Sequence, residues 1–119
     1  NSIANATCYL NGGAFGNGSV VADAHMEEAG DSNTNYFYMI AYLQELQGGV
    51  WYDIDWRDTY SDRFPDNNST SHYFNHHFKI PVVDNSVYYH RIDVVYQWWK
   101  SRASGDRLVW QVERHGRKC

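Results

Sequence analysis

The chain has 119 residues and a net charge of −4, and its ten lysine and arginine residues are spread along the sequence apart from a basic stretch near the C-terminal end. This length is enough for one domain, residues 1–119, with a hydrophobic core. The sequence contains no apolar run of the roughly 18 residues that a membrane span needs, and no basic stripe that would suit a nucleic acid. We therefore expect a single domain with no membrane span and no nucleic-acid partner.

Period-two alternation of apolar and polar residues predicts an all-β domain. At residues 26–30 the sequence is also compatible with a single helical turn. The segment 36–45 is apolar on both faces, which is typical of a central strand. Gly48 and Gly49 predict a hairpin turn, and 58–71 is expected to be a long loop. The predicted strands, about seven in all, are 8–10, 20–27, 36–45, 50–57, 73–80, 88–101 and 108–113.

The same alternation assigns the tryptophans to faces. Trp56, Trp98 and Trp110 align with apolar neighbours on their strands and are expected in the core. Trp51 and Trp99 align with charged or polar neighbours and are expected to face solvent. Since Trp51 and Trp56 are an odd number of positions apart, they should lie on opposite faces of one strand.

The two cysteines of the chain, Cys8 and Cys119, lie near its two ends. A disulfide between them would close almost the whole chain into a ring and stabilise it by roughly 4–5 kcal/mol in the chain-entropy picture. It would require the first and last segments to lie within about 7 Å, Cα to Cα. Two unrelated thiols are the alternative. We expect a Cys8–Cys119 disulfide, which is typical of an oxidising compartment. The chain starts with Asn1 and not with a methionine, which is typical of a chain whose signal peptide has been removed. Together these features predict secretion to an extracellular or periplasmic compartment.

Residues 81–90, PVVDNSVYYH, resemble the tyrosine-corner region of immunoglobulin-like domains, where an Asp precedes a Tyr by four residues just before a long penultimate strand. Asp84 and Tyr88 match those places, and His90 stands where an antibody-type domain carries its second core cysteine. The resemblance implies a single antiparallel immunoglobulin-like β-sandwich with neighbouring first and last strands, and a Tyr88 hydroxyl bonded to the preceding crossover. It implies nothing about activity.

Candidate metal ligands occur in two groups. His72, His76 and His77 cannot share one zinc ion on a regular strand, because neighbours face opposite sides and positions four apart are about 13 Å apart. An acidic run could offer oxygen ligands to calcium, but it lacks the Gly and the final Glu of an EF-hand and is expected to be a solvated loop. The run consists of Asp53, Asp55, Asp58, Asp62 and Asp66.

The sequence shows no nucleophile elbow and no phosphate-binding loop. A nucleophile beside a histidine is not indicated either, since both cysteines are expected to be bonded. Two carboxylates in a cleft would be the route to glycoside hydrolysis. We expect no catalytic residues, no metal and no cofactor.

The aromatic content is the strongest functional indication. Five Trp, ten Tyr and five Phe exceed what so small a core needs, and exposed Tyr and Trp are enriched in binding sites. The competing interpretation is that arginines such as Arg91 and Arg57 cover Trp51 and Trp99 in cation–π pairs. The candidate residues of a partner surface are Trp51, Trp99, Tyr89, Asp53, Asp55 and Arg91.

These observations predict a secreted, non-enzymatic binding or adaptor module. The favoured partner is another secreted or surface protein within an extracellular assembly. A carbohydrate-binding module is the second hypothesis, and a small secreted hydrolase or toxin is the enzymatic alternative. A flat aromatic patch would favour a protein partner, a Trp-lined groove a sugar, and clustered carboxylates or histidines in one cleft an enzyme.

Overall fold

The computed structural model describes residues 2–3, 9–10, 18–30, 33–67, 69–82 and 88–118. Within these ranges the chain is all-β, in two antiparallel sheets, as the alternation predicts. Six strands are long and two have only two residues each. In chain order they are β1 (Ser2–Ile3), β2 (Tyr9–Leu10), β3 (Gly18–Ala29), β4 (Tyr36–Gln47), β5 (Val50–Tyr60), β6 (Ser71–Val82), β7 (His90–Lys100) and β8 (Arg107–His115).

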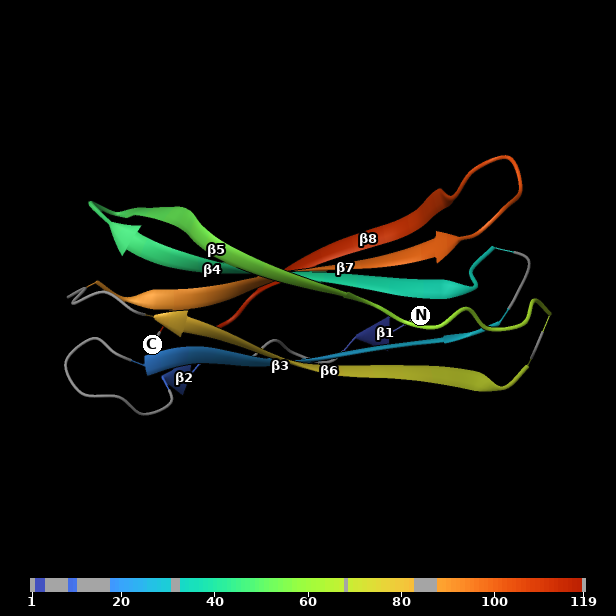
Figure 1. Ribbon diagram of the computed structural model, residues 1–119, viewed down its shortest axis with the longest axis horizontal. Coiled ribbons are helices and arrows are strands. Elements are labelled where there is room, and N and C mark those ends of the chain that lie inside the picture. Colours follow the sequence, from blue (N-terminus) through green and yellow to red (C-terminus); the bar gives the residue numbers. More distant parts are fainter. Residues whose placement is uncertain are drawn as a thin grey trace.

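The two sheets lie one above the other as the layers of an elongated sandwich (Figure 1) that measures 51 × 23 × 19 Å. One layer has the strand order β5-β4-β7-β8. The other is built on the long β3–β6 pair, with β1 and β2 pairing with β3. The chain therefore passes between layers after β3, after β5 and after β6. No helix in the described ranges is long and apolar enough to cross a membrane.

Some strand boundaries differ from the prediction. Residues 26–29 continue β3 as a strand, because they pair with the start of β6 along the whole segment. The strand β5 continues to Tyr60 through its pairing with β4, which shortens the expected loop. The strand β7 begins at His90, two residues later than expected, and the short β1 was not predicted.

The turn between β4 and β5 follows the sequence. Gly48 and Gly49 both have positive φ, 58° and 79°, as a two-residue hairpin turn of the primed type requires. β4 lies between β5 and β7, and one of its faces packs on the core. The apolar pattern and the turn thus place β4 centrally, as predicted.

The core lies between the layers, and the inner faces of β4 and β7 supply most of it. On β7 the expected face, from His90 through Ile92, Val94 and Tyr96 to Trp98, is buried. Trp98 is 0% exposed, meets Phe37 edge-on and packs against Trp110 with ring centroids 4.4 Å apart. The buried residues of the core cluster are Ala24, Met26, Phe37, Met39, Ala41, Leu43, Phe64, Phe78, Ile80, Ile92, Val94, Tyr96 and Trp98.

His90 is also buried, and its Nε2 lies 3.2 Å from a carboxylate oxygen of Glu45 on β4. A charged or polar pair in the interior is stable only when its members satisfy each other. The position that the immunoglobulin resemblance assigns to a core cysteine is therefore occupied by an inward-facing histidine with a partner on the neighbouring strand.

Both edge strands of the β5-β4-β7-β8 sheet carry a one-residue bulge. In the β4–β5 ladder, Leu43 faces Asp55 but Gln44 faces Asp53, so Ile54 is the extra residue. In the β7–β8 ladder the shift leaves Val109 as the extra residue. A bulge reverses which face the following side chains occupy. The alternation of β5 and β8 therefore changes phase midway.

Cys8, Cys119 and Asp84, on which the disulfide and tyrosine-corner predictions rest, lie outside the described ranges. The Cys8–Cys119 disulfide and the place of Asp84 in the tyrosine corner therefore stay predictions. Tyr88 is described and is half-exposed just before β7.

Candidate functional site

The face of the β5-β4-β7-β8 sheet that points away from β3 and β6 gathers most of the notable side chains, and we call it the outer face. Directly opposed residues on neighbouring strands share a face, so the register defines its members. They are Trp51, Asp53, Trp56, Asp58 and Tyr60 on β5; Tyr36, Tyr38, Ile40, Tyr42, Gln44 and Leu46 on β4; Arg91, Asp93, Val95, Gln97 and Trp99 on β7; and Leu108, Gln111, Glu113 and His115 on β8.

At one end of the outer face, three of the predicted site residues come together. The Arg91 guanidinium lies over the Trp51 ring, 4.3 Å from its centroid. Arg91 Nε donates a 2.6 Å hydrogen bond to Gln44 Oε1, and Gln44 Nε2 donates one of 2.8 Å to Asp53. These contacts confirm the competing interpretation for Trp51, since the arginine covers its ring and leaves it half-buried.

At the other end, tyrosine hydroxyls are held by carboxylates. Tyr38 donates a 2.6 Å hydrogen bond to Asp58 and stacks on Tyr60, with ring centroids 4.1 Å apart. Burial, followed by the hydrogen bond to Asp58, raises the pKa of Tyr38 well above its usual value of 10. The hydroxyl therefore stays protonated, and the stacked pair presents a fixed aromatic surface.

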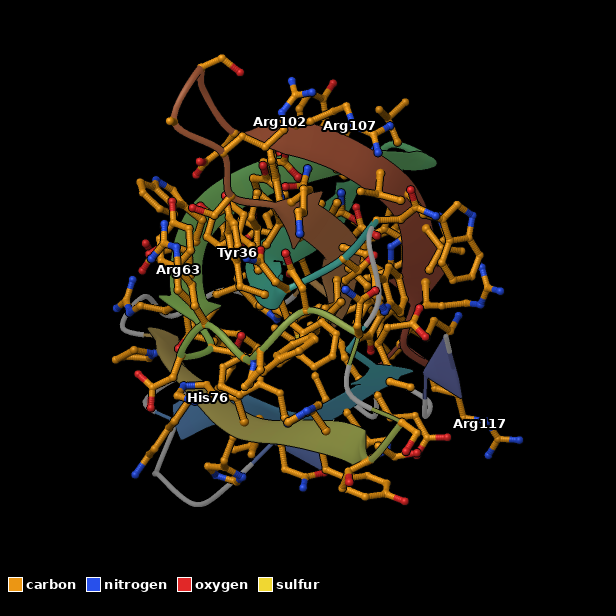
Figure 2. All side chains as sticks on the ribbon, turned by 90° about the vertical axis from the view of Figure 1, so that its right-hand side faces the viewer. Tyr36, Arg63, His76, Arg102, Arg107 and Arg117 are labelled. Atoms are coloured by element: carbon orange, nitrogen blue, oxygen red, sulfur yellow. The ribbon has the colours of Figure 1, made fainter. Side chains whose placement is uncertain are left out.

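Tyr36 is held in the same way beside it. Its hydroxyl donates a 2.6 Å hydrogen bond to Asp106, and the Arg63 guanidinium lies over its ring. Figure 2, viewed from this end of the sandwich, shows Arg63 next to Tyr36 and both Arg102 and Arg107 above them. The hydrogen bond from Tyr36 lowers the pKa of Asp106. Trp99 stacks on Tyr36 and donates through Nε1 to Gln97 at 2.9 Å, which leaves its ring half-buried.

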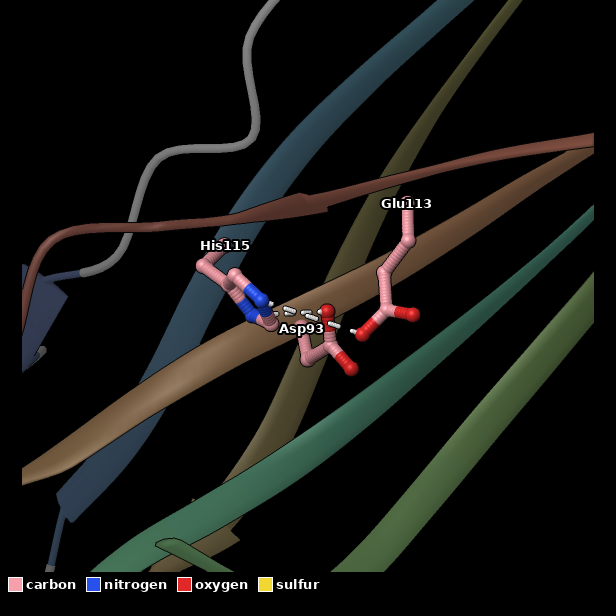
Figure 3. A group of neighbouring side chains, drawn as sticks. All are labelled: Asp93, Glu113 and His115. Atoms are coloured by element: carbon pink, nitrogen blue, oxygen red, sulfur yellow. Dashed lines mark ion pairs between the residues drawn. The ribbon is translucent and has the colours of Figure 1, made fainter.

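The centre of the outer face combines an aromatic pair with a titratable cluster. Trp56 lies opposite Tyr42, and Tyr42 lies opposite Asp93. Asp93 is joined by His115, whose Nδ1 is 3.0 Å from Asp93 Oδ1, and by Glu113, whose Oε1 is 3.9 Å from His115 Nε2 (Figure 3). Burial, and then the hydrogen bond and negative charge of Glu113, raise the pKa of Asp93 from 3.8 to about 7.

The remaining predicted site residues lie elsewhere. Asp55 is paired with Leu43 and therefore lies on the opposite face of β5 from Asp53, where it accepts a 2.9 Å bond from Arg57. Tyr89 is exposed before β7, with Lys118 over its ring. Arg91 and Trp99 are eight positions apart on β7, or roughly 26 Å along a strand, so Trp51 and Trp99 do not share one patch.

Two tryptophan predictions are wrong. Trp56 was expected in the core but is 56% exposed on the outer face, because the bulge at Ile54 reverses the phase of β5. Trp51 and Trp56 consequently share a face. Trp110 does lie opposite Trp98 on the inner face, yet it is 39% exposed. It sits on an edge strand, and within the described residues the facing sheet has two long strands, β3 and β6, to cover it.

The predicted metal-ligand groups are dispersed, as expected for the histidines. His72 stacks on Phe64 and His76 contacts Phe78 edge-on, while His77 is exposed on the other face of β6. The acidic run is also divided, since Asp58 accepts from Tyr38 and Asp66 pairs with Lys100. No pattern in the sequence marks the cluster of Asp93, Glu113 and His115, because it forms only when β7 pairs with β8.

Comparisons of the chain with protein-family models, with curated proteins and with solved structures found no match.

Proposed function

We propose that this chain is a non-enzymatic binding module that contacts a partner protein through the outer face. The observation that carries the proposal is the aromatic surface of β5 and β4. Trp56 and Tyr60 are each more than half exposed, and Tyr38 and Tyr42 lie opposite them on β4. Exposed aromatic patches of this kind mark interaction sites. The patch lies on the outside of a sheet rather than in a groove, which favours a protein over a sugar.

The charges around the patch indicate the chemistry of the partner. On the four strands of the outer face, carboxylates such as Asp53, Asp58 and Glu113 outnumber arginines, of which the register gives Arg91. Arg63 adds one guanidinium over the ring of Tyr36. A partner surface rich in Lys and Arg would complement the carboxylates. The Arg91–Trp51 pair illustrates how such a guanidinium packs on a tryptophan here, and Trp56 offers a second indole for the same contact.

We further propose that the sandwich is of the immunoglobulin-like type, secreted, and closed by a Cys8–Cys119 disulfide. Support comes from the strand order, with β3–β6 facing β5-β4-β7-β8, and from the inward position of His90. Lys118, next to Cys119, stacks on Tyr89 before β7, and β2, next to Cys8, lies toward the same end of the long axis (Figure 1). Non-reducing peptide mapping tests the disulfide: a Cys8–Cys119 peptide is expected, and free thiols at both positions would contradict it.

The clustered carboxylates Asp93 and Glu113 would favour a hydrolase if they flanked a cleft. Glycosidases place such a pair on either side of a cleft that holds the sugar. Here the pair lies on the outer face of a sheet. A pocket of about 460 Å³ lies apart from this pair, beside residues 60–65, and its lining combines Phe37, Phe64 and Phe74 with Asp62 and His72. The binding module therefore remains the preferred proposal.

Site-specific photo-crosslinking tests the proposed face. A photoreactive phenylalanine analogue replaces Trp56 or Tyr60 in one set of proteins, and in the control it replaces Tyr73, which is equally exposed on β6. We expect crosslinks to one protein partner from the first two positions and none from Tyr73. Trp56→Ala should weaken binding of the identified partner by about 2 kcal/mol or more, as loss of an aromatic anchor does. Crosslinks from Tyr73 alone, or binding only to a glycan array, would refute the proposal.

A further inference from the structure

The cluster at the centre of the outer face has the composition of a metal site. Glu113 and His115 are two positions apart on β8 and so point to the same side, and the register sets His115 directly opposite Asp93 on β7. One ligand atom from each of the three residues can be chosen so that all lie within 4.8 Å of one another. Figure 3 shows the three side chains converging from the two neighbouring strands.

A second observation distinguishes this cluster from ordinary surface charges. Asp93 is only 5% exposed, and its Oδ1 atom is buried without a hydrogen bond. His115 Nδ1 lies 3.0 Å from that oxygen but does not satisfy it with hydrogen-bond geometry. A buried carboxylate oxygen that accepts no hydrogen bond is unfavourable unless a positive charge compensates it, whether a protonated His115 in the ion pair or a bound cation. A cation between Asp93 and His115 would supply that compensation.

We propose that Asp93, Glu113 and His115 form a binding site for one divalent transition-metal ion, with Zn²⁺ the ion best suited to it. Two carboxylates balance the charge of the ion, and an imidazole ligand favours zinc over calcium or magnesium, which bind mainly oxygens. Three protein ligands leave a fourth tetrahedral position for water or a donor from outside the chain.

The distances fit such an ion after small movements. Zinc bonds of about 2.0–2.2 Å place neighbouring ligand atoms roughly 3.3 Å apart. His115 Nδ1 lies 3.0 Å from Asp93 Oδ1, and the other ring nitrogen, Nε2, lies 3.9 Å from Glu113 Oε1. Because a single ion binds one imidazole nitrogen, the imidazole ring or the Glu113 side chain would have to rotate so that both carboxylates face the same nitrogen. Glu113 and His115 are half-exposed on an edge strand, so their side chains have room to adjust. The buried Asp93 would stay in place, and the side chains of Glu113 and His115 would move toward the ion that it binds.

Calorimetric titration of the metal-free, full-length chain with ZnCl₂ at pH 7.5 tests the site. We compare the unchanged protein with Glu113→Gln and His115→Asn, which alter half-exposed side chains and should leave the core intact. His25→Gln is the matched control, because His25 pairs with a carboxylate, Glu27, at 3.5 Å but belongs to no group of three ligand-type side chains among the described residues. Circular dichroism verifies that each variant is folded.

We expect one zinc ion per chain, a loss of affinity of at least about tenfold in each site variant, and no change in His25→Gln. Substitution with Co²⁺ should give a visible absorption band that His115→Asn abolishes. Absence of zinc binding, an affinity in both site variants that equals that of the unchanged protein, or loss of binding in His25→Gln would overturn the proposal. The result does not depend on whether the outer face binds a protein, so the two proposals fail separately.

Discussion

Truncation of Trp98 is the sharpest test of the described packing. Its side chain is fully buried between the layers, against Phe37 and Trp110. A buried tryptophan removes roughly 150–250 Å² from water, which corresponds to roughly 4–6 kcal/mol at about 25 cal/mol per Å². Alanine keeps part of this contribution, and core substitutions of this kind are measured at about 3–5 kcal/mol. We expect that range for Trp98→Ala.

Trp56→Ala is the matched control, because it removes the same side chain from the outer face. More than half of Trp56 is exposed, so less than half of the transfer free energy is lost and no closed cavity forms. We expect a loss of about 1–2 kcal/mol. The sequence-based assignment of Trp56 to the core would instead make the two variants equal.

Urea unfolding followed by far-UV circular dichroism measures both variants without depending on tryptophan fluorescence. For a small domain, a loss of about 4 kcal/mol lowers the urea midpoint by roughly 1–4 M. If Trp98→Ala does not fold, Trp98→Phe, which keeps one aromatic ring in place, supplies the comparison. Equal losses of stability for Trp56→Ala and Trp98→Ala would refute the assignment of Trp56 to the outer face.

Three further predictions concern the turn, the central carboxylate and the corner. Gly49→Ala should lower the free energy of unfolding by about 1 kcal/mol, because Gly49 has φ of 79°, which an alanine adopts only with strain. Gly48→Asn should be tolerated at the neighbouring position. Equal urea midpoints for the two variants would contradict the turn type. Folding raises the pKa of Asp93 to about 7, so the folded state favours the protonated carboxyl; this contribution to stability is complete below about pH 4 and is lost as the pH rises to 7. With a chelator present, Asp93→Asn should therefore become increasingly more stable than the unchanged protein between about pH 4 and pH 7. A difference in melting temperature that stays constant over this range would oppose the pKa assignment. Tyr88→Phe should reduce stability by about 0.5–1.5 kcal/mol if the hydroxyl bonds the crossover, and an unchanged denaturation midpoint would remove that support for the immunoglobulin-like fold.

The sequence alone determined the elements and most of their buried faces. Alternation located the six long strands, and the apolar character of residues 36–45 placed β4 in the centre of its sheet. The inner face of β7, from His90 to Trp98, and the turn at Gly48 and Gly49 were also predicted. These features depend on neighbouring residues, on a period of two and on the freedom of glycine to adopt positive φ.

Only the tertiary structure decided which side chains share the outer face. A bulge adds one residue to a strand of period two, so the face of every later side chain is reversed. Nothing in the sequence around Ile54 or Val109 marks such a residue, because its position follows from pairing with the neighbouring strand. The bulge at Ile54 moved Trp56 from the expected core to the surface. The pairing of β7 with β8 likewise brought Asp93 to Glu113 and His115, which are about 20 residues away along the chain.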